Sequence, residues 1–258
     1  MRKFDSRLGN TASFIYRWTS PVVDPVRFFR GVAGYFWYFR DWIKYTTDKN
    51  SEKIRIADTF PCLHDKTDVT PFDRHYFHQD IWAFKKILKS GCKNHVDVGS
   101  RIDFAGLLTA VTKVTAIDIR PLNVNLENFE SKRGSILQMP FESDSVPSLS
   151  CLHVAEHIGL GRYGDLIDPL GTKKAAKELS RILAMGGNLY FSLPIGKPKL
   201  YFNAHRIHSV QQILDYFSDL QLIELAGIDD QRCFYSNVNR QFWDSCTYGC
   251  GLFHFTKK

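Results

Sequence analysis

The stretch "HVDVGSR", residues 95–101, places two functional residue types at the end of a predicted strand. Residues 95–98 predict the first strand of a parallel sheet. Asp97 and Gly99 then fall at its carboxyl end, the edge where open parallel sheets bind ligands. We therefore expect the ligand site of this protein to begin at this edge.

A second acidic residue, Asp118, follows Asp97 by twenty-one residues and ends the next predicted strand, "VTAIDI". An acid at this position can accept hydrogen bonds from both hydroxyls of a ribose. The glycine fingerprint of a dinucleotide fold is absent, since "GSRIDF" holds one glycine where such a fold has three. The pattern therefore predicts a nucleoside ligand without phosphates and disfavours a nicotinamide oxidoreductase.

Strands and helices alternate from residue 72 onward, as in a sheet with helices on both faces. We predict a Rossmann-like α/β domain at residues 72–258 with a central, mostly parallel, seven-stranded sheet. The predicted strands are 95–98, 114–119, 135–137, 149–154, 188–193, 220–228 and 251–256. The predicted helices are 73–91, 104–111, 122–129, 173–185 and 210–217, with Asp73 and Ser209 as N-caps and Gly91 as a stop signal.

Residues 1–71 predict a helical, aromatic extension. Up to residue 60 there are eleven Lys or Arg against six Asp or Glu, so much of the net charge of +7 lies here. A helix after Asp24 and Pro25 interleaves aromatic with basic residues, and Arg30 and Arg40 bracket only nine residues, too few to span a bilayer. Residues 24–45 therefore predict peripheral contact with a membrane. The alternatives are packing on the protein's own domain or on a second subunit of a homodimer.

Several motifs together resemble class I S-adenosylmethionine-dependent methyltransferases. They are "HVDVGSR", Asp118, "GSILQMPF" at 134–141 and "KELSRILAMGGNLYFSLP" at 177–194. The resemblance implies S-adenosyl-L-methionine as the cofactor, with the first motif facing the methionine, the second-strand acid the ribose, and the residues after the third strand the adenine. The implied cofactor residues are Asp97, Gly99, Ser100, Asp118, Ile119, Ser135, Ile136 and His153. Ser100 and Arg101 replace glycines of that family, and Ser135 stands where an aspartate is frequent.

A narrower resemblance covers "TFPCLHDKT", "FDRHYFHQDIWAFKKI", "EHIGLGRYGD" and "FNAHRIHS". These stretches are similar to a methyltransferase-like branch met among bacterial surface-polysaccharide genes. The resemblance implies a small-molecule or saccharide acceptor and a role in polysaccharide biosynthesis. Nucleic acid is not expected as a partner, because the basic excess lies outside the predicted crevice.

The loop "EHIGLGRYGD" begins where the fourth strand ends, beside the expected position of the transferable methyl group. Methyl transfer to oxygen or nitrogen usually removes one proton from the acceptor. His157 is the first candidate for the base, with Glu156 beside it. Arg162, Tyr163 and Asp165 are candidates for acceptor binding. The alternative is a structural turn built on three glycines.

The stretch "FNAHRIHS" follows the fifth strand at the same edge of the predicted sheet. Asn203 and Arg206 are expected to contact the acceptor, and His205 is a competing base. If neither His157, Glu156 nor His205 acts on an acceptor, the alternative function is a catalytically inactive, nucleoside-binding interaction subunit at a membrane.

Metal chemistry is not expected from the sequence. His153, Glu156 and His157 match the H-x-x-E-H zinc pattern, but they straddle a strand end, where residues i and i+4 form no chelating face. Cys246, Cys250 and His254 lack a second ligand pair. The six cysteines, without a secretory signal, predict reduced thiols and a cytoplasmic protein, at the inner face of the membrane if the N-terminal helix binds lipid.

Overall fold

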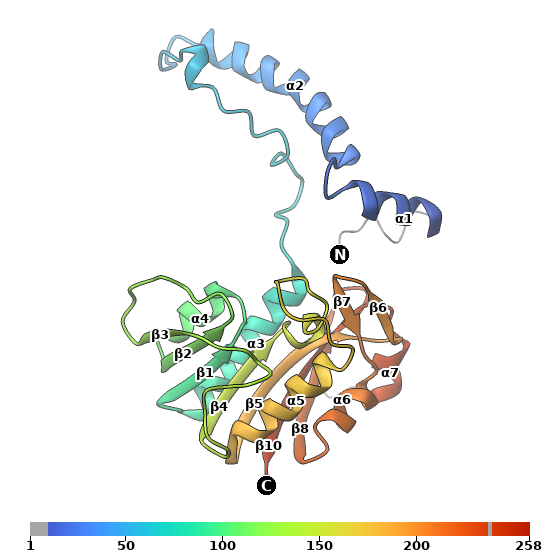
Figure 1. The fold of residues 1–258 in the computed structure, drawn as a ribbon. Coiled ribbons are helices and arrows are strands. Elements are labelled where there is room, and N and C mark those ends of the chain that lie inside the picture. The colour runs from blue at the N-terminus through green and yellow to red at the C-terminus, as the bar shows by residue number, and fades with distance from the viewer. Residues whose placement is uncertain (1–9, 237–238) are drawn as a thin grey trace. The chain divides into compact units, whose positions relative to one another are not determined.

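The chain forms two units, Met1–Pro71 and Phe72–Lys258, and the computed structural model describes residues 10–236 and 239–258. The second unit contains the sheet (Figure 1). Its helices are α3 (Arg74–Ser90), α4 (Ile102–Leu108), α5 (Gly171–Ile182), α6 (Val210–Tyr216) and α7 (Arg240–Ser245), with a 3-10 helix, η2, at Ala155–His157. Its strands are β1 (Asn94–Val98), β2 (Lys113–Asp118), β3 (Phe129–Arg133), β4 (Val146–Leu152), β5 (Leu183–Ile195), β6 (Lys199–Tyr201), β7 (His205–Ile207), β8 (Leu220–Ile228), β9 (Phe234–Ser236) and β10 (Gly249–Lys257).

The main sheet of the described residues has the strand order β3-β2-β1-β4-β5-β10-β8-β9. The five strands from β3 to β5 pair in parallel, and β10 inserts antiparallel between β5 and β8. The Rossmann-like, mostly parallel α/β fold predicted from the sequence is therefore confirmed. The sheet has eight strands instead of seven, because the three-residue β9 pairs with the end of β8.

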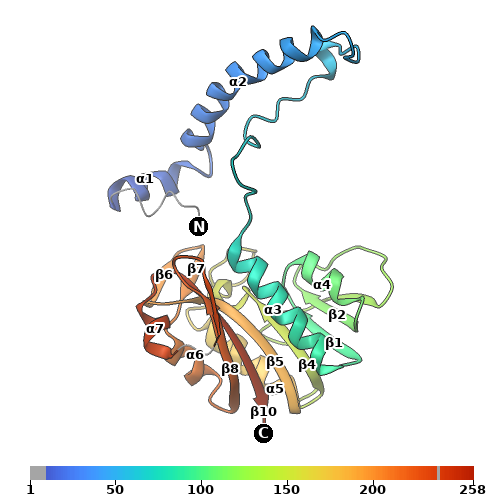
Figure 2. The same ribbon diagram turned by 180° about the vertical axis from the view of Figure 1, so that it is seen from behind.

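Helices cover both faces of the sheet, as predicted. The face in front in Figure 1 is covered by α5 and α6, and Figure 2 shows α3 on the opposite face. Two apolar cores correspond to these layers. One packs α5 and α6 residues such as Leu179 and Ile213 against Leu149 and Phe191, and the other packs α3 and α4 residues such as Trp82 and Phe104. The carboxyl ends of the parallel strands lie between these two helical layers.

Two predicted elements are wrong. Residues 122–129 form no helix, and residues 135–137 form no strand beyond a single bridge between Ser135 and Gln138. The third strand is β3 (Phe129–Arg133), just before the predicted one. The segment "PLNVNLEN" alternates apolar and polar residues behind a proline, and Asn128 has a φ of 59°. That pattern favours extended chain over helix. The edge strand itself is polar and largely exposed, so it gives little hydrophobic signal.

The helix boundaries follow the capping signals of the sequence. Asp73 accepts hydrogen bonds from the backbone of His75 and Tyr76, and Gly91 ends α3 with a φ of 63°. Ser209 forms the expected capping box of α6. The two N-caps, Asp73 and Ser209, supply acceptors for backbone N–H groups that the start of a helix leaves unbonded. The cap at Asp73 fixes the first turn of α3, whose side chains belong to the candidate site.

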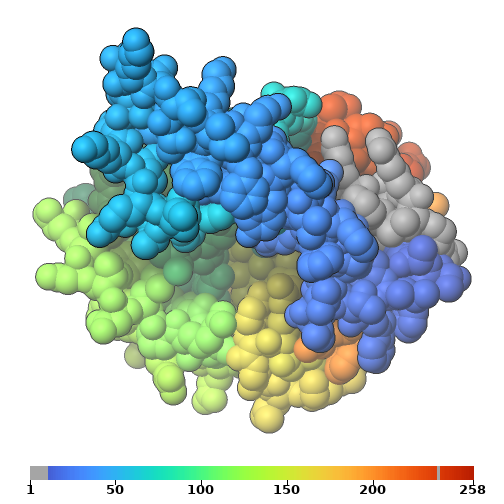
Figure 3. Space-filling view, turned by 90° about the horizontal axis from the view of Figure 1, so that it is seen from above, coloured from blue at the N-terminus to red at the C-terminus, as the bar shows by residue number. Residues whose placement is uncertain are grey.

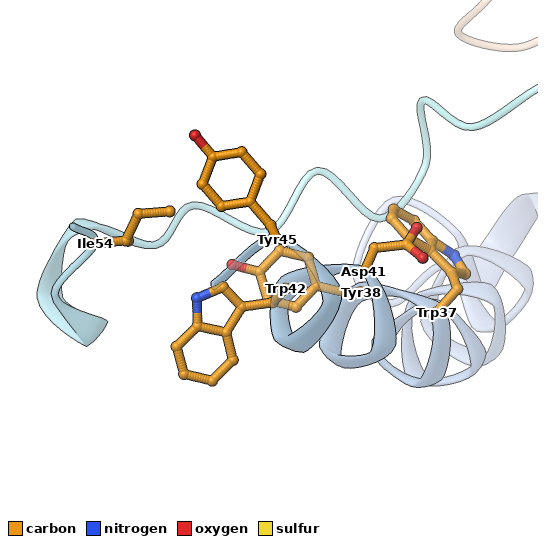
Figure 4. Close-up of a pocket in the computed structure, with 6 residues that line it drawn as sticks. All are labelled: Trp37, Tyr38, Asp41, Trp42, Tyr45 and Ile54. Carbon is orange, nitrogen blue, oxygen red and sulfur yellow. The ribbon is translucent and has the colours of Figure 1, made fainter. Parts of the chain in front are cut away.

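The N-terminal unit contains α1 (Asn10–Thr19), α2 (Pro25–Thr46) and the 3-10 helix η1 (Ile56–Asp58). Asp24 caps α2 as predicted, by accepting from the backbone of Arg27. The segment after α2 folds back on it, and a side chain at Gly34 would meet Leu63. A shallow groove of about 230 Å³ is lined by Trp37, Tyr38, Asp41, Trp42, Tyr45 and Ile54 (Figure 4). No helix within 10–236 or 239–258 is long and apolar enough to cross a bilayer.

Candidate active site

Gly99 forms the turn between β1 and α4 at the carboxyl edge of the sheet. Its φ of +64° is a conformation that other residues rarely adopt. A Cβ atom here would lie 3.2 Å from Val154 Cγ1 and 3.6 Å from Asp118 Oδ2. Gly99 and Asp118, both predicted cofactor residues, are therefore neighbours, and glycine keeps the space between them open.

Asp97 is buried beneath this turn. Its carboxylate accepts from Ser150 Oγ on β4 (2.5 Å) and from the backbone N–H of Ser100 (3.2 Å), while Ser100 Oγ accepts from the backbone N–H of Leu152 (3.1 Å). Burial raises the pKa of Asp97 to about 6, although the hydrogen bonds to its carboxylate oppose the shift. Asp97 and Ser100 hold the turn against β4 and so position Gly99.

Asp118 ends β2 with its side chain partly exposed. Its Oδ1 accepts from the backbone N–H of Arg120 (2.7 Å), and Arg120 Nε lies 3.9 Å from the same oxygen. No donor among the described residues reaches Oδ2, which lies toward Gly99. One carboxylate oxygen is thus available to a ligand hydroxyl. Ile119 follows at the same edge with a partly exposed side chain.

The segment after β3 carries Ser135 and Ile136 beside the end of β2, because the backbone N–H of Gly134 donates to the Asp118 carbonyl (3.1 Å). Ser135 Oγ accepts from the backbone N–H of Leu137 (3.2 Å). Ile136 is buried and packs into the core below α5. A ligand at this position would therefore meet the backbone of these residues and not the Ile136 side chain.

His153 follows β4 with a φ of 56° and a buried ring. Its Nδ1 lies 2.7 Å from Gln79 Oε1, and Ser192 Oγ lies 2.6 Å from the same oxygen. His153 Nε2 is buried without a hydrogen-bond partner among the described residues. The ring therefore presents an unused nitrogen at the end of β4.

Glu156 and His157 lie together on η2, directly after His153. Glu156 is 1% exposed, and neither carboxylate oxygen has a hydrogen-bond partner among the described residues. Its Oε1 lies 3.5 Å from His157 Nε2. Burial raises the pKa of Glu156 to about 8 and lowers that of His157 to about 4. Near neutral pH the carboxyl group is therefore protonated and the imidazole is neutral.

The tautomer of His157 is set by the β6–β7 hairpin. His157 Nδ1 lies 2.5 Å from the carbonyl oxygen of Ala204, which can only accept, so Nδ1 carries the proton and Nε2 the lone pair. Arg162 Nη1 donates to the same carbonyl (3.1 Å). Its 3.3 Å approach to His157 Nδ1 brings two donors together and is not a hydrogen bond. The free nitrogen of His157 thus faces Glu156.

Two of the predicted acceptor residues hold the loop that follows η2. Asp165 accepts from the backbone N–H groups of Gly159 (2.6 Å) and Tyr163 (3.3 Å). Arg206 donates to the carbonyls of Ile158 (2.6 Å) and Asp168 (3.1 Å). These contacts support the structural interpretation of the loop. In the view from above, part of the loop, in yellow, is exposed at the surface (Figure 3).

Tyr163 is approached by two guanidinium groups at the rim of the site. Arg120, from the end of β2, lies 4.6 Å from the centre of its ring, and Arg162 lies 5.1 Å from it. Cation–π contacts of this kind link the end of β2 to the loop after η2. The rim next to Asp118 therefore carries two positive charges over an aromatic ring.

Histidine and tyrosine rings connect the predicted clusters. His205 is buried, and its Nε2 has no hydrogen-bond partner among the described residues. Asn203 is exposed on the β6–β7 hairpin and no contact of its side chain is found in the described part of the chain. Neighbouring rings lie with centroids 5.2–6.5 Å apart in the order His153, His75, Tyr248, His205, His157 and Tyr163.

Sequence reasoning missed His75, Tyr76 and Tyr248. His75 and Tyr76 lie in the first turn of α3, and the Tyr76 ring lies 5.2 Å from that of His153. The N-cap at Asp73 could have indicated His75 and Tyr76, because it places both aromatic residues in the first turn of a helix. Tyr248 precedes β10 and is nearly one hundred positions from Glu156, so only the antiparallel return of the chain brings it here.

The fold of the second unit is that of class I S-adenosylmethionine-dependent methyltransferases. The N-methyltransferase NodS of Bradyrhizobium japonicum WM9, solved with S-adenosyl-L-homocysteine, is similar with a TM-score of 0.51 and 13% identity over 84% of this chain and 97% of that chain. A protein from Galdieria sulphuraria assigned as a sarcosine dimethylglycine methyltransferase has a TM-score of 0.51 and 13% identity over 70% of this chain and 86% of that chain. At this identity the similarity establishes the fold.

The chain belongs to the family described as "Caenorhabditis protein of unknown function, DUF268", whose model matches residues 96–231, just over half of the sequence. No curated protein matches the sequence. The matched region begins within β1 and includes η2, the loop after it and the β6–β7 hairpin.

The first prediction concerns Glu156→Gln and stability. The pKa of Glu156 in the fold, about 8, lies above its ordinary value of 4.5. The folded state therefore keeps a proton that the unfolded chain releases between these values, and the resulting stability is present below pH 4.5 and lost as the pH rises to about 8. Glutamine stays neutral, so the variant should gain on the order of 2 kcal/mol relative to the parent between about pH 5 and pH 8.

Urea unfolding at several pH values across this window measures the difference in the free energy of unfolding. The surface variant Glu142→Gln is the control and should follow the parent. Identical pH dependence in Glu156→Gln and the parent would mean that Glu156 is ionised in the folded protein.

Proposed function

We propose that the protein is an S-adenosylmethionine-dependent methyltransferase. The observation that carries the proposal is the pairing of Gly99 with Asp118, where an open turn meets a carboxylate oxygen that no donor among the described residues reaches. The hydroxyls of a ribose can donate hydrogen bonds to that oxygen, and the open turn suits a methionine. A pyrophosphate would need further glycines in the turn. The fold shared with NodS, which was solved with S-adenosyl-L-homocysteine, supports the same cofactor.

Asp118→Ala is expected to weaken binding of S-adenosyl-L-homocysteine by roughly 10–100-fold, because hydrogen bonds from hydroxyls to a charged acceptor are lost. Isothermal titration calorimetry measures the affinity. Asp103→Ala is the matched control, since Asp103 is an exposed carboxylate of the adjacent α4 that pairs with Arg101. Equal affinity in Asp118→Ala and the parent would remove the basis for this ribose site.

The cofactor, when bound, supplies an electrophilic methyl group on a sulfonium. The protein must then align the acceptor, exclude water and accept the acceptor's proton. His157 Nε2 is suited to the last task, because the Ala204 carbonyl fixes the proton on Nδ1 and burial keeps the ring neutral. Protonated Glu156, whose Oε1 lies 3.5 Å from His157 Nε2, adds no negative charge beside this nitrogen.

His157→Ala should lower the methyl-transfer rate by roughly 10²–10⁴-fold with little change in cofactor affinity. Transfer of radiolabelled methyl to a panel of sugars, sugar phosphates and nucleotide sugars measures the rate. The parent rate should rise as the pH passes the His157 pKa of about 4 and then stay level until Glu156 ionises near its pKa of about 8.

His205→Ala serves as the comparison, because His205 is the competing base on the same crevice. A larger loss in His205→Ala than in His157→Ala would exchange their roles. Full activity in both variants would place the chemistry elsewhere. Cofactor binding without transfer to any acceptor would favour the inactive, nucleoside-binding interaction subunit.

A polar acceptor that carries negative charge, such as a phosphorylated saccharide, fits the rim best. Arg120 and Arg162 both lie near the Tyr163 ring, and guanidinium groups bind phosphate and carboxylate through paired hydrogen bonds. Aromatic side chains at such a rim also suit the apolar face of a sugar ring. These contacts support a carbohydrate-related acceptor of the kind used in surface-polysaccharide biosynthesis.

The N-terminal unit, in this proposal, holds the enzyme at an anionic membrane surface. Trp18, Phe29 and Phe36 are 74%, 70% and 80% exposed, and Arg27 and Arg30 lie on the same helix as the two phenylalanines. Exposed aromatic residues next to basic ones bind the interface of anionic bilayers. This segment has fewer acidic than basic residues, so its net charge is positive. A positive surface favours an anionic lipid over a protein partner that carries both charges.

The double variant Phe29→Ser with Phe36→Ser is expected to reduce cosedimentation with phosphatidylglycerol vesicles by about tenfold or more, because these two large apolar side chains no longer enter the interface. Phe202→Ser is the control, since Phe202 is equally exposed but lies in the second unit. Equal binding to neutral phosphatidylcholine vesicles would contradict the charge argument. Loss of a dimer in sedimentation analysis, without any vesicle binding by the parent, would assign the surface to a second copy of the chain.

A further inference from the structure

Three side chains with metal-binding atoms converge beside the candidate active site. His75 comes from the first turn of α3, His153 from the end of β4, and Cys250 from β10. One ligand atom of each lies within 4.8 Å of the other two. We call these residues the His75–His153–Cys250 cluster. None of them has a part in the proton transfer proposed for His157.

His153 is oriented as a ligand would be. Gln79 Nε2 donates to Asp80 Oδ1 (3.0 Å), so the amide oxygen is the atom that faces His153. That oxygen accepts from His153 Nδ1, which therefore holds the ring proton. The remaining nitrogen, Nε2, has a lone pair, is buried and has no hydrogen-bond partner among the described residues. A fixed Nδ1–H with a free Nε2 is the arrangement that metal-binding histidines show.

Cys250 and His75 supply the other two ligand atoms of the cluster. Cys250 is fully buried and forms no disulfide, so its sulfur is a thiol. His75 is held by stacking on Tyr248, with ring centroids 5.5 Å apart and planes inclined by 20°. Around a tetrahedral zinc ion the ligand atoms would lie about 3.3–3.7 Å apart, so the cluster has to close by about 1 Å. Side-chain rotation of His75 can supply that movement.

We infer that the His75–His153–Cys250 cluster binds a divalent transition metal of the zinc type. Two imidazole nitrogens and one thiolate favour Zn²⁺ or Co²⁺ over Mg²⁺ and Ca²⁺, which prefer oxygen ligands. Three protein ligands leave a fourth position open for water or an acceptor group. Binding replaces the Cys250 S–H bond with a sulfur–metal bond, and the thiol proton is released to the solvent.

The His75–His153–Cys250 cluster differs from both metal patterns found in the sequence. Cys246 Sγ lies 3.7 Å from the Phe242 carbonyl, and His254 Nε2 is bonded to Asn188 Oδ1 (2.7 Å). Cys250 therefore pairs with two histidines that lie far from it in the chain. His153, the first residue of the H-x-x-E-H pattern, has its metal-binding partners on other elements, and not at His157.

Metal binding by the full chain tests the inference without any methyl acceptor. The protein is treated with a chelator, dialysed and titrated with Co²⁺, and zinc affinity is then measured by competition with a chromophoric chelator. We expect about one equivalent of metal, the absorption of a tetrahedral cobalt site with a thiolate-to-cobalt band, and release of about one proton per metal ion. A parent protein that binds no metal, or whose cobalt spectrum lacks the thiolate band, overturns the inference.

Substitutions identify the ligands. Cys250→Ser should abolish the thiolate band, and His75→Ala and His153→Ala should weaken zinc binding by about 100-fold or more, whereas Gln79→Ala should weaken it by about 10–100-fold. Cys62→Ser and His78→Ala are matched controls on an exposed thiol and on the same helix as His75. Far-ultraviolet circular dichroism and urea unfolding of each variant check that it is folded, because His153 is itself an expected cofactor residue. Zinc affinity unchanged in a folded Cys250→Ser or His153→Ala variant overturns the inference.

Discussion

The hydrogen bond between Asp97 on β1 and Ser150 on β4 is the constraint on which the candidate site depends. It joins two adjacent parallel strands in the buried centre of the sheet, and the same carboxylate holds the backbone of Ser100. Ser150 also lies 2.8 Å from His95, which in turn contacts Ser148, so a chain of polar groups runs through the core. Buried polar groups cost free energy unless they are hydrogen-bonded, so a network of bonded groups favours one register of the strands. That register places Gly99 beside both Asp118 and Val154, and hence opens the space for a ligand.

Burial separates neutral groups from charged ones in the candidate site. Its inner groups, Glu156, His157 and His205, are neutral near neutral pH, because desolvation raises the pKa of the carboxyl group and lowers those of both imidazoles. The permanent charges lie at the rim, on Asp118, Arg120 and Arg162. A charged cofactor and a polar acceptor would therefore meet fixed charges at the entrance and neutral proton donors and acceptors inside. This arrangement suits a reaction that moves one proton in a water-poor site.

The sequence predicted much of the fold, whereas the roles of the candidate site residues stay predictions. Strand β5 was predictable because it holds a mostly apolar, buried stretch, and α3 and α6 because their caps are explicit. β3 was missed because an edge strand carries polar residues on both faces and resembles a loop. The same limit applied to the loop after η2. Arginine, aspartate and glycine are equally common in a binding loop and in a structural turn, and only the contacts of Asp165 and Arg206 with backbone groups favour the second role.

The sequence by itself determined the fold class, the position of Gly99 and Asp118 at strand ends, and the proximity of Glu156 to His157, because each follows from local periodicity or from chain neighbours. Only the tertiary structure decided the protonation state of that pair, the tautomer of His157 and the meeting of His75, His153 and Cys250. These properties depend on burial and on contacts between residues up to 175 positions apart in the chain, from His75 to Cys250. No local pattern encodes such contacts, since they arise when α3 packs against the sheet and β10 returns antiparallel between β5 and β8.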